Sequence, residues 1–296
     1  MDVFCSTIIP TVNRPTLSRA VYSLLEQAFS AADFEVIVVN DSGQPMPDTD
    51  WRHSERVRVI DTNRRERSVA RNTGAAIARG KYLHFLDDDD WLLPGALDAF
   101  WALDQTGDAV WLYGSYQTVD NDGNLIEEFH PGITGNIFAL LVAGEGIPFQ
   151  VSLLQTRQFY AVGGFDPHPT ITGVEDRDLG RRMALTGAVA YTPAIVAKIR
   201  IGQQGSTTNW ATLAESDRRG REKVLSAQNA FARLRTSANS SYWRGRVSRA
   251  YFASMVWNLR RKNIFAAASR ATAGLVFAGA HTLSADFWHG LRTKIK

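Results

Sequence analysis

The sequence has almost no cysteine and no strong excess of charge of either sign. Cys5 is the single cysteine among 296 residues, so an internal disulfide is excluded, and its apolar neighbours predict a small core residue. The formal net charge is only +3, which provides no chain-wide basic field for nucleic acid. Nucleic acid is therefore not an expected partner.

Long hydrophobic runs are also absent. The most apolar long window, residues 264–283, is interrupted by Arg270 and His281, and it predicts a packed or interfacial helix rather than a membrane span. The start of the chain lacks the basic segment of a secretory signal. We therefore expect a cytoplasmic protein, and its 45% of hydrophobic residues suffices for a large folded core.

Basic residues are concentrated near the end of the chain. Residues 241–296 hold ten lysines and arginines against one acid, Asp286. Such a segment is either a solvated helical face or a surface that contacts phosphates or an anionic membrane. Both alternatives stay open, and the second predicts peripheral contact with the inner face of a membrane.

The first hundred residues alternate between short apolar runs and helical patterns. The apolar runs predict buried strands at residues 3–10, 34–39, 57–60 and 82–86. The helical patterns begin after Pro15 and cover residues 68–78 and 94–103. This alternation is typical of right-handed βαβ units on a parallel sheet, where ligands bind at the carboxyl ends of the strands.

The second half has a different pattern. Asp122-Gly123 lies between strand-like residues 110–119 and 125–129, which predicts a hairpin. A helix is expected over residues 174–185, and a strand over residues 188–200 that Pro193 confines to an edge or breaks. The polar loop 202–208 is expected to close over a bound ligand, and the pattern from residue 209 onward is helical.

Four consecutive aspartates, residues 87–90, follow the strand 82–86. Crowded carboxylates raise one another's pKa values, and a divalent cation removes this repulsion. Oxygen ligands suit Mg²⁺ or Mn²⁺, and Mg²⁺ is usually bound by one or two carboxylates together with substrate phosphates. The alternative is an acidic helix N-terminus, where aspartates are also favourable.

Three further positions carry charged groups that the predicted crevice could use. Asp41 follows the second strand, where it is either a turn former or a hydrogen-bond acceptor for a base or ribose. Arg71 is either a surface charge or a partner for diphosphate oxygens. Glu175-Asp176 is either a dipole partner at a helix start or a general base with a supporting carboxylate.

Five segments occur in the order of a known family's motifs. They are Ile8-Ile9-Pro10-Thr11-Val12-Asn13-Arg14, Val38-Val39-Asn40-Asp41-Ser42-Gly43, Ala70-Arg71-Asn72-Thr73-Gly74, Phe85-Leu86-Asp87-Asp88-Asp89-Asp90, and Gly163-Gly164-Phe165-Asp166 followed by Glu175-Asp176. Over residues 3–200 the chain therefore resembles the family 2 glycosyltransferases, which are inverting enzymes with the GT-A fold.

The resemblance implies a role for each matching residue. The nucleotide sugar would contact residues of the strand ends and of the Arg71 helix: Pro10, Thr11, Val12, Asn13, Asp41, Arg71, Asp87 and Asp88. Asp89, with Asp87 near it, would hold Mn²⁺ or Mg²⁺ at the diphosphate. Asp176 would be the catalytic base, supported by Glu175, and Asp90 would be structural.

The resemblance also implies the architecture and the partners. Residues 1–208 would form a GT-A α/β domain, a mixed and mainly parallel sheet flanked by helices, with a nucleotide-binding half (1–105) and an acceptor half (106–208). Residues 209–296 would be a helical, basic C-terminal extension. The implied partners are a nucleotide-sugar donor, with UDP as the expected nucleotide, and a glycan or lipid-linked acceptor, as in polysaccharide biosynthesis.

Two departures from the family pattern keep alternatives open. Asn40 replaces the commoner first aspartate, and Gly202-Gln203-Gln204-Gly205 stands where many relatives have a histidine. One alternative is a sugar-phosphate nucleotidyltransferase, but its glycine-rich phosphate loop is missing from residues 11–15. The other is a degenerate, non-catalytic glycan-binding module, against which the intact acidic residues argue.

Overall fold

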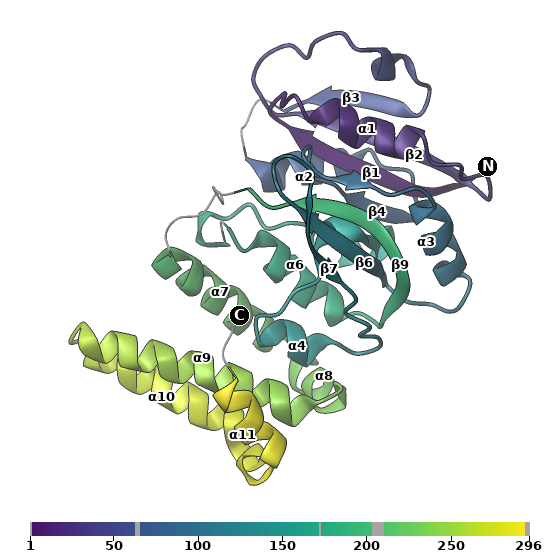
Figure 1. Ribbon diagram of the computed structural model, residues 1–296. Helices are drawn as coiled ribbons and strands as arrows, with labels where there is room; N and C mark the ends of the chain where they lie inside the picture. The colour runs from purple at the N-terminus through teal and green to yellow at the C-terminus, as the bar shows by residue number, and fades with distance from the viewer. Residues whose placement is uncertain (1, 63–65, 172, 203–209, 294–296) are drawn as a thin grey trace. The chain divides into compact units, whose positions relative to one another are not determined.

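The computed structural model describes residues 2–62, 66–171, 173–202 and 210–293. Its contacts group the chain into two units, the first made of residues 1–135 and 147–222 and the second of residues 136–146 and 223–296. Figure 1 shows the strands in the first unit and the last helices in the second. The predicted boundary at residue 208 lies outside the described residues and stays a prediction.

The first unit contains a nine-stranded mixed sheet. Its strands are β1 (Val3–Thr11), β2 (Asp33–Asn40), β3 (Val57–Asp61), β4 (Tyr82–Phe85), β5 (Trp91–Leu92), β6 (Trp111–Val119), β7 (Leu125–Phe129), β8 (Ser152–Gln155) and β9 (Val189–Arg200). Their order is β3-β2-β1-β4-β8-β6-β9-β5, with β7 paired to β6. Strands β1 to β4 are parallel, and β8 runs antiparallel to both neighbours. The predicted mixed sheet is confirmed, with a parallel part formed by β1 to β4.

Helices connect and cover these strands. Those of the first unit are α1 (Leu17–Leu25), α2 (Arg67–Ala76), α3 (Ala96–Asp104), α5 (Thr156–Ala161), α6 (Glu175–Ala184) and most of α7 (Trp210–Leu225), with the short 3₁₀ helices η1 (Asp50–His53), η2 (Phe149–Val151) and η3 (Pro169–Ile171). Buried Arg181 of α6 donates from Nη2 to Asp217 of α7 at 2.6 Å, which fixes these two helices to each other.

Consecutive residues of β1 face two different helices. Ile9 lies in the core cluster with Leu17, Val21 and Leu24 of α1. Ile8 points the other way, and a Cβ added at Gly74 of α2 would lie only 2.5 Å from its side chain. The chain adds β2 and β3 on one side of β1 and then returns to add β4 on the other side, with α1 and α2 on opposite faces of the sheet. A crevice is expected at the carboxyl ends of β1 and β4, where the strand order changes direction.

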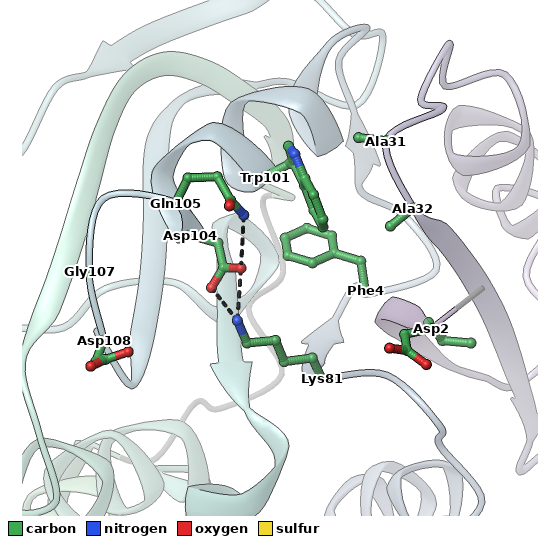
Figure 2. A pocket seen from close by; sticks show the side chains of 11 residues that line it. Asp2, Phe4, Ala31, Ala32, Lys81, Trp101, Asp104, Gln105, Gly107 and Asp108 are labelled. Atoms are coloured by element: carbon green, nitrogen blue, oxygen red, sulfur yellow. Dashed lines mark hydrogen bonds and ion pairs between the residues drawn. The ribbon is translucent and has the colours of Figure 1, made fainter.

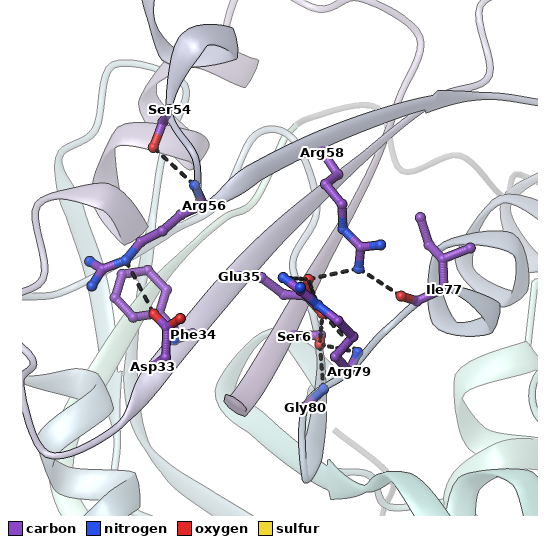
Figure 3. A network of polar contacts seen from close by, with 10 residues as sticks. All are labelled: Ser6, Asp33, Phe34, Glu35, Ser54, Arg56, Arg58, Ile77, Arg79 and Gly80. Carbon is purple, nitrogen blue, oxygen red and sulfur yellow. Dashed lines mark hydrogen bonds and ion pairs between the residues drawn. The ribbon is translucent and has the colours of Figure 1, made fainter. Parts of the chain in front are cut away.

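A buried carboxylate ties the other end of the parallel strands together (Figure 3). Glu35 of β2 accepts hydrogen bonds from the Ser6 hydroxyl at 2.6 Å and from Arg58 Nη2 at 2.7 Å. It also accepts from the backbone N–H of Arg79 at 2.8 Å. Burial raises the pKa of Glu35, but the bonds from Ser6 and Arg79 and the Arg58 charge outweigh it, so the net shift is downward.

The hairpin predicted around Asp122-Gly123 is confirmed as β6–β7. The strand predicted over residues 188–200 is also confirmed, although it is not an edge strand: β9 lies between β6 and β5. Its pairing with β6 shifts register between Thr192 and Ile195, so Pro193 occupies an irregularity where no ladder N–H is needed. The short strands β5 and β8 had not been predicted.

The second unit is helical. It contains α4 (Phe138–Val142), α8 (Ala230–Thr236), α9 (Ser240–Arg260), α10 (Ile264–Ala278), η4 (Gly279–Leu283) and α11 (Ala285–Arg292). A close approach holds α11 on α9, since a Cβ at Gly245 would lie 2.1 Å from the carbonyl oxygen of Phe287. Among the described residues, no helix combines the length and the apolar character needed to cross a membrane.

Candidate active site

The crevice at the carboxyl ends of β1, β2 and β4 is a cavity of about 460 Å³. Most of the predicted site residues line it, namely Pro10, Thr11, Val12, Asp41, Arg71, Asp87, Asp88 and Asp89. The cavity wall also includes residues that had not been predicted for the site, among them Arg14, Arg67, Gln150 and Arg200. The topology therefore brings four of the five motifs to one cavity, whereas the predicted site residues Asn13, Glu175 and Asp176 are not part of its lining.

Thr11 and Asp88 join the ends of β1 and β4. The Thr11 hydroxyl donates to Asp88 Oδ2 at 2.6 Å and accepts from the N–H of Asn13 at 3.0 Å. Arg14 Nη1 lies 3.1 Å from both Asp88 Oδ1 and Asp89 Oδ2. Burial raises the pKa of Asp88, while Thr11 and Arg14 oppose this shift. Arg14 is the last residue of the motif that contains Thr11 and Asn13, so the sequence did contain a signal for it.

Asn40 and Asp41 end β2 in different ways. Asn40 is fully buried, and its side chain donates to the Gln44 carbonyl at 2.7 Å and accepts from the Ser42 hydroxyl at 2.6 Å. It therefore builds the turn rather than facing a ligand. Asp41 lines the cavity, and the Thr62 hydroxyl donates to its Oδ1. Of these two residues, Asp41 is therefore the one whose side chain is available to a ligand in the cavity.

Arg71 connects two parts of the acidic site. Its Nη2 donates to Asp87 Oδ1 at 2.8 Å, and its Nη1 lies 3.6 Å from Asp176 Oδ1 and 3.9 Å from Glu175 Oε1. Burial lowers the pKa of Arg71, but Asp87 and Asp176 raise it more. Nη1 is buried without a hydrogen-bond partner among the described residues. A donor of this kind is available to an incoming oxygen anion.

Gln150 completes the surroundings of Asp87. Its side-chain amide donates to Asp87 Oδ2 at 2.8 Å, so both carboxylate oxygens of Asp87 are engaged. The backbone carbonyl of Gln150 lies 2.9 Å from Nε2 of buried His84, whose Nδ1 lies 3.1 Å from the Thr7 hydroxyl. Burial lowers the pKa of His84 to about 4, so this ring is neutral and holds Gln150 in place. No sequence motif marks Gln150.

Asp176 is at the start of α6, next to Glu175. The Asp176 side chain is 49% exposed, whereas Glu175 is buried and its Oε2 has no hydrogen-bond partner among the described residues. Although the side chain is half exposed, the protein groups around its carboxylate displace part of its hydration and raise the pKa of Asp176 to about 6, with Glu175 adding to the rise and Arg71 opposing it. A carboxylate with this pKa is ionised at neutral pH and can take a proton.

The turn before α6 is attached to α2. Asn72 donates from Nδ2 to the carbonyl of Phe165 at 2.8 Å and accepts from its N–H at 2.9 Å. Gly164 has φ +66°, and a Cβ there would lie 2.8 Å from Asn72 Oδ1. Arg182 of α6 donates to the Gly164 carbonyl at 2.7 Å. These contacts hold Asp176 at a fixed place relative to Arg71, one residue before Asn72.

Asp89 is the aspartate of the cluster that best fits a metal ion. Its side chain is 31% exposed, and burial together with the charge of Asp87 raises its pKa, which a cation would relieve. Within the described ranges, no group of three or more His, Cys, Asp and Glu side chains could hold a metal by itself. An ion bound at Asp89 would therefore need further ligands from outside this cluster, such as phosphate oxygens or water.

Asp90 also borders the cavity, but its carboxylate is engaged within the protein. It is buried, and its Oδ1 accepts from the backbone N–H of Arg200 at 2.7 Å, which ties the end of β9 to the acidic segment. Burial and the nearby Asp87 raise the pKa of Asp90 well above its ordinary value. Of the predicted closing loop 202–208, residues 203–208 lie outside the described residues.

A larger cavity of about 590 Å³ lies at the opposite, amino-terminal ends of the strands (Figure 2). Its Lys81 donates to Asp104 at 2.7 and 2.8 Å, and the Tyr82 hydroxyl also donates to Asp104 at 2.6 Å. Lys81 and Asp104 therefore neutralise each other's charge within this cavity. The smaller cavity, which has a buried arginine donor and two partly exposed carboxylates, Asp87 and Asp89, is the better candidate for chemistry.

The chain is similar to known proteins over part of its length. Residues 6–155, half of the chain, match the model of the family described as Glycosyl transferase family 2. The poly(ribitol-phosphate) beta-N-acetylglucosaminyltransferase TarP of Staphylococcus aureus is 29% identical over 117 residues, 38% of this chain and 36% of that protein. The glycosyltransferase GlyG of Streptococcus pneumoniae is 28% identical over 148 residues, 47% of each chain.

A solved structure shares the fold over more of the chain. Staphylococcus aureus TarS, residues 1–349, in complex with UDP-GlcNAc, aligns with a TM-score of 0.65 at 15% identity and covers 92% of this chain and 91% of that one. This likeness concerns the fold alone. Among the curated relatives, the matched segments span 21% to 47% of their own lengths.

Proposed function

The chain belongs to glycosyl transferase family 2, and on that premise we propose that it transfers a sugar from a nucleoside diphosphate to an acceptor hydroxyl with inversion. One observation carries the proposal: Arg71 joins Asp87 at the strand end to Asp176 on α6 beside a cavity lined by the predicted donor residues. Such a site has a base on one side and charge-stabilising groups on the other.

The donor would lie along the carboxyl ends of the strands. Asp41 and Thr11 would contact the base and Asp88 the ribose, with Pro10 at the end of β1 and Val12 and Asn13 in the loop after it beside them. UDP is the expected nucleotide, since the structural relative TarS was solved with UDP-GlcNAc. Arg71 Nη1, which has no hydrogen-bond partner among the described residues, would donate to a diphosphate oxygen.

Asp89 would hold Mn²⁺ or Mg²⁺, which neutralises charge that develops on the leaving diphosphate. Both oxygens of Asp87 accept hydrogen bonds, so Asp87 would act beside the ion mainly by orienting Arg71. This division of roles refines the expectation that Asp89, with Asp87 near it, holds the metal.

The reaction would be a single in-line displacement. Asp176 takes the proton of the acceptor hydroxyl, whose oxygen forms a bond to the anomeric carbon. The bond from that carbon to the diphosphate breaks, and its electron pair leaves with the nucleoside diphosphate. Attack on the face opposite the leaving group inverts the anomeric configuration. Glu175 would support the base, because its charge raises the pKa of Asp176.

The acceptor would be a glycan or a lipid-linked glycan, and the place of action the cytoplasm or the inner face of a membrane. A screen of nucleotide sugars with Mn²⁺ or Mg²⁺, which measures nucleoside diphosphate release with and without acceptors, tests the proposal. NMR of the product tests inversion. Pyrophosphate release from a nucleoside triphosphate and a sugar phosphate would instead identify a nucleotidyltransferase. Metal-dependent nucleotide binding without release from any donor would identify a binding module.

A further inference from the structure

Helix α10 exposes an uncharged face along its whole length. Phe265 is 89% exposed, Leu275 64% and Val276 72%. The exposed positions between them are Ala268, Ser269 and Thr272. Positions 265, 268, 272 and 275 follow helical spacing, so these side chains form one continuous face. Apolar side chains this exposed over one helix face usually mark a contact surface.

The opposite face of α10 is fixed against α9, with which it lies side by side in Figure 1. A Cβ at Gly274 would lie 2.8 Å from the ring of Phe252, and the Ser248 hydroxyl donates to the Gly274 carbonyl at 3.1 Å. Ala267 and Phe277 are buried on the same side. Because this packing uses the small-residue face, Phe265 and Leu275 cannot turn inward without separating the two helices.

The turn between α9 and α10 carries three consecutive exposed cations, Arg260, Arg261 and Lys262. The Arg261 guanidinium lies 4.0 Å from the ring centre of Trp257, which is itself exposed. Asn263 then caps α10 by accepting from the N–H of Ala266 at 3.2 Å. Cations and an exposed indole therefore adjoin the apolar face at its N-terminal end.

Charge is divided unequally between the two units. The second unit has thirteen lysines and arginines against two acids, Glu145 and Asp286. The first unit has twenty basic residues against twenty-eight acidic ones. The net charge of +3 for the whole chain hides this difference. The exposed apolar face belongs to the strongly cationic unit, whose net charge attracts anionic partners.

We propose that the α10 face and the turn 260–262 bind an anionic lipid bilayer, with α10 lying in the plane of the interface. Aliphatic and aromatic side chains would enter the boundary between head groups and acyl chains, and the cations would contact lipid phosphates. Symmetric pairing of two copies would bring two cationic units together, and nucleic acid would leave Leu275 and Val276 without an apolar partner. An anionic bilayer offers an apolar interior to the α10 face and phosphate groups to the cations.

The inference rests on the proposed function in one respect: the membrane would supply a lipid-linked acceptor for sugar transfer. Vesicle binding needs no sugar transfer, so it can fail or succeed independently of activity. The full chain should sediment with vesicles that contain about 30% phosphatidylglycerol and stay in solution with pure phosphatidylcholine. Raising the salt from about 0.1 M to about 0.5 M should weaken binding, because the shorter Debye length screens the cations.

Two sets of variants identify the surface. Replacing Arg260, Arg261 and Lys262 by Gln should lower the vesicle partition coefficient about a hundredfold, at about fivefold per cation. Phe265→Glu with Leu275→Glu should abolish binding, whereas Leu125→Glu on the exposed strand β7 of the other unit should leave it unchanged. All replaced side chains are exposed, so unchanged thermal unfolding shows that the variants are folded.

Other results would overturn the proposal. Equal binding to neutral and anionic vesicles, or binding that both variant sets leave intact, excludes this surface. Light scattering that shows a dimer, dissociated by Phe265→Glu with Leu275→Glu, would assign the face to a second copy of the chain. Salt-sensitive binding to a nucleic acid but not to anionic vesicles would assign the cations to that polymer.

Discussion

Arg71 donates from Nη2 to Asp87 at 2.8 Å, so a helix residue and a strand-end residue form one charged unit. The second guanidinium nitrogen lies near Asp176. Movement of Asp87 and movement of the proposed base are therefore linked through one buried side chain. Arginine suits this position because its planar guanidinium presents donors in fixed directions toward the two carboxylates. The ammonium group of lysine is a point charge whose donors rotate.

Arg71→Lys is expected to lower kcat/KM by about 10²-fold, the usual cost of losing one oriented donor to developing charge. Lysine keeps the positive charge but lacks the two guanidinium nitrogens that point toward Asp87 and Asp176. Arg56→Lys is the matched control, because Arg56 pairs with Asp33 at 3.4 Å, both side chains are half-exposed and lie outside the cavity lining, and exposed ion pairs contribute little. Steady-state kinetics of both variants check this, and equal losses in the two would contradict a special role for Arg71.

The pH dependence of kcat/KM should show an acidic limb near pH 6, the pKa of Asp176. The base must be ionised, so activity falls as the pH drops through this value and is level above it. Arg71 lowers the pKa of Asp176, and Arg71→Gln should therefore move the limb to higher pH. An acidic limb that stays in place in Arg71→Gln would speak against this pairing.

Much of the site could be predicted because its residues lie in short motifs at strand ends. Arg71, Asp87 and Asp88 were predicted as donor-site residues, and the topology places all three on one cavity. The same motifs also contain residues with structural roles, and the sequence alone does not separate these from the residues that line the cavity. Asn72 fixes the turn at Phe165, and Gly74 allows α2 to approach β1.

Gln150 could not be predicted because its importance depends on tertiary contacts alone. It belongs to a three-residue 3₁₀ helix, and it reaches Asp87 from a distance of 63 positions in the sequence. Strand β8 escaped prediction for the same reason, since its four residues are defined by pairing with β4 and β6. Local sequence patterns do not report such contacts.

Gln150→Leu should lower kcat by about tenfold or more while folding is retained, because Asp87 Oδ2 loses its donor at similar side-chain volume. Gln158→Leu on α5 is the control, with a side chain of the same size away from the cavity. Kinetics with saturating donor measure the effect. If kcat is unchanged, Asp87 does not need Gln150 for its orientation.

Removal of divalent metal with EDTA should abolish activity, and Mn²⁺ or Mg²⁺ should restore it. Asp89→Asn should need a higher metal concentration for half-maximal rate, because the partly exposed carboxylate is the proposed protein ligand. Asp90→Asn should not change this concentration, since Asp90 bonds to the Arg200 backbone. Titration of the rate with metal compares the variants. An identical metal requirement in Asp89→Asn and the wild type would exclude Asp89 as a ligand.

Glu35→Gln should destabilise the first unit at neutral pH by about 3 kcal/mol, as expected when a buried ion pair is broken. The pKa of Glu35 is below its ordinary value of 4.5, so the folded state prefers the ionised form. The stabilisation is therefore full above pH 4.5 and is lost as the pH falls through the lowered pKa. Urea unfolding of both proteins at several pH values should show their difference shrinking below pH 4.5. Asp33→Asn, whose half-exposed side chain pairs with Arg56 at 3.4 Å, should differ little from the wild type at any pH. A constant difference for Glu35→Gln at every pH would mean that packing, rather than charge, makes Glu35 stabilising.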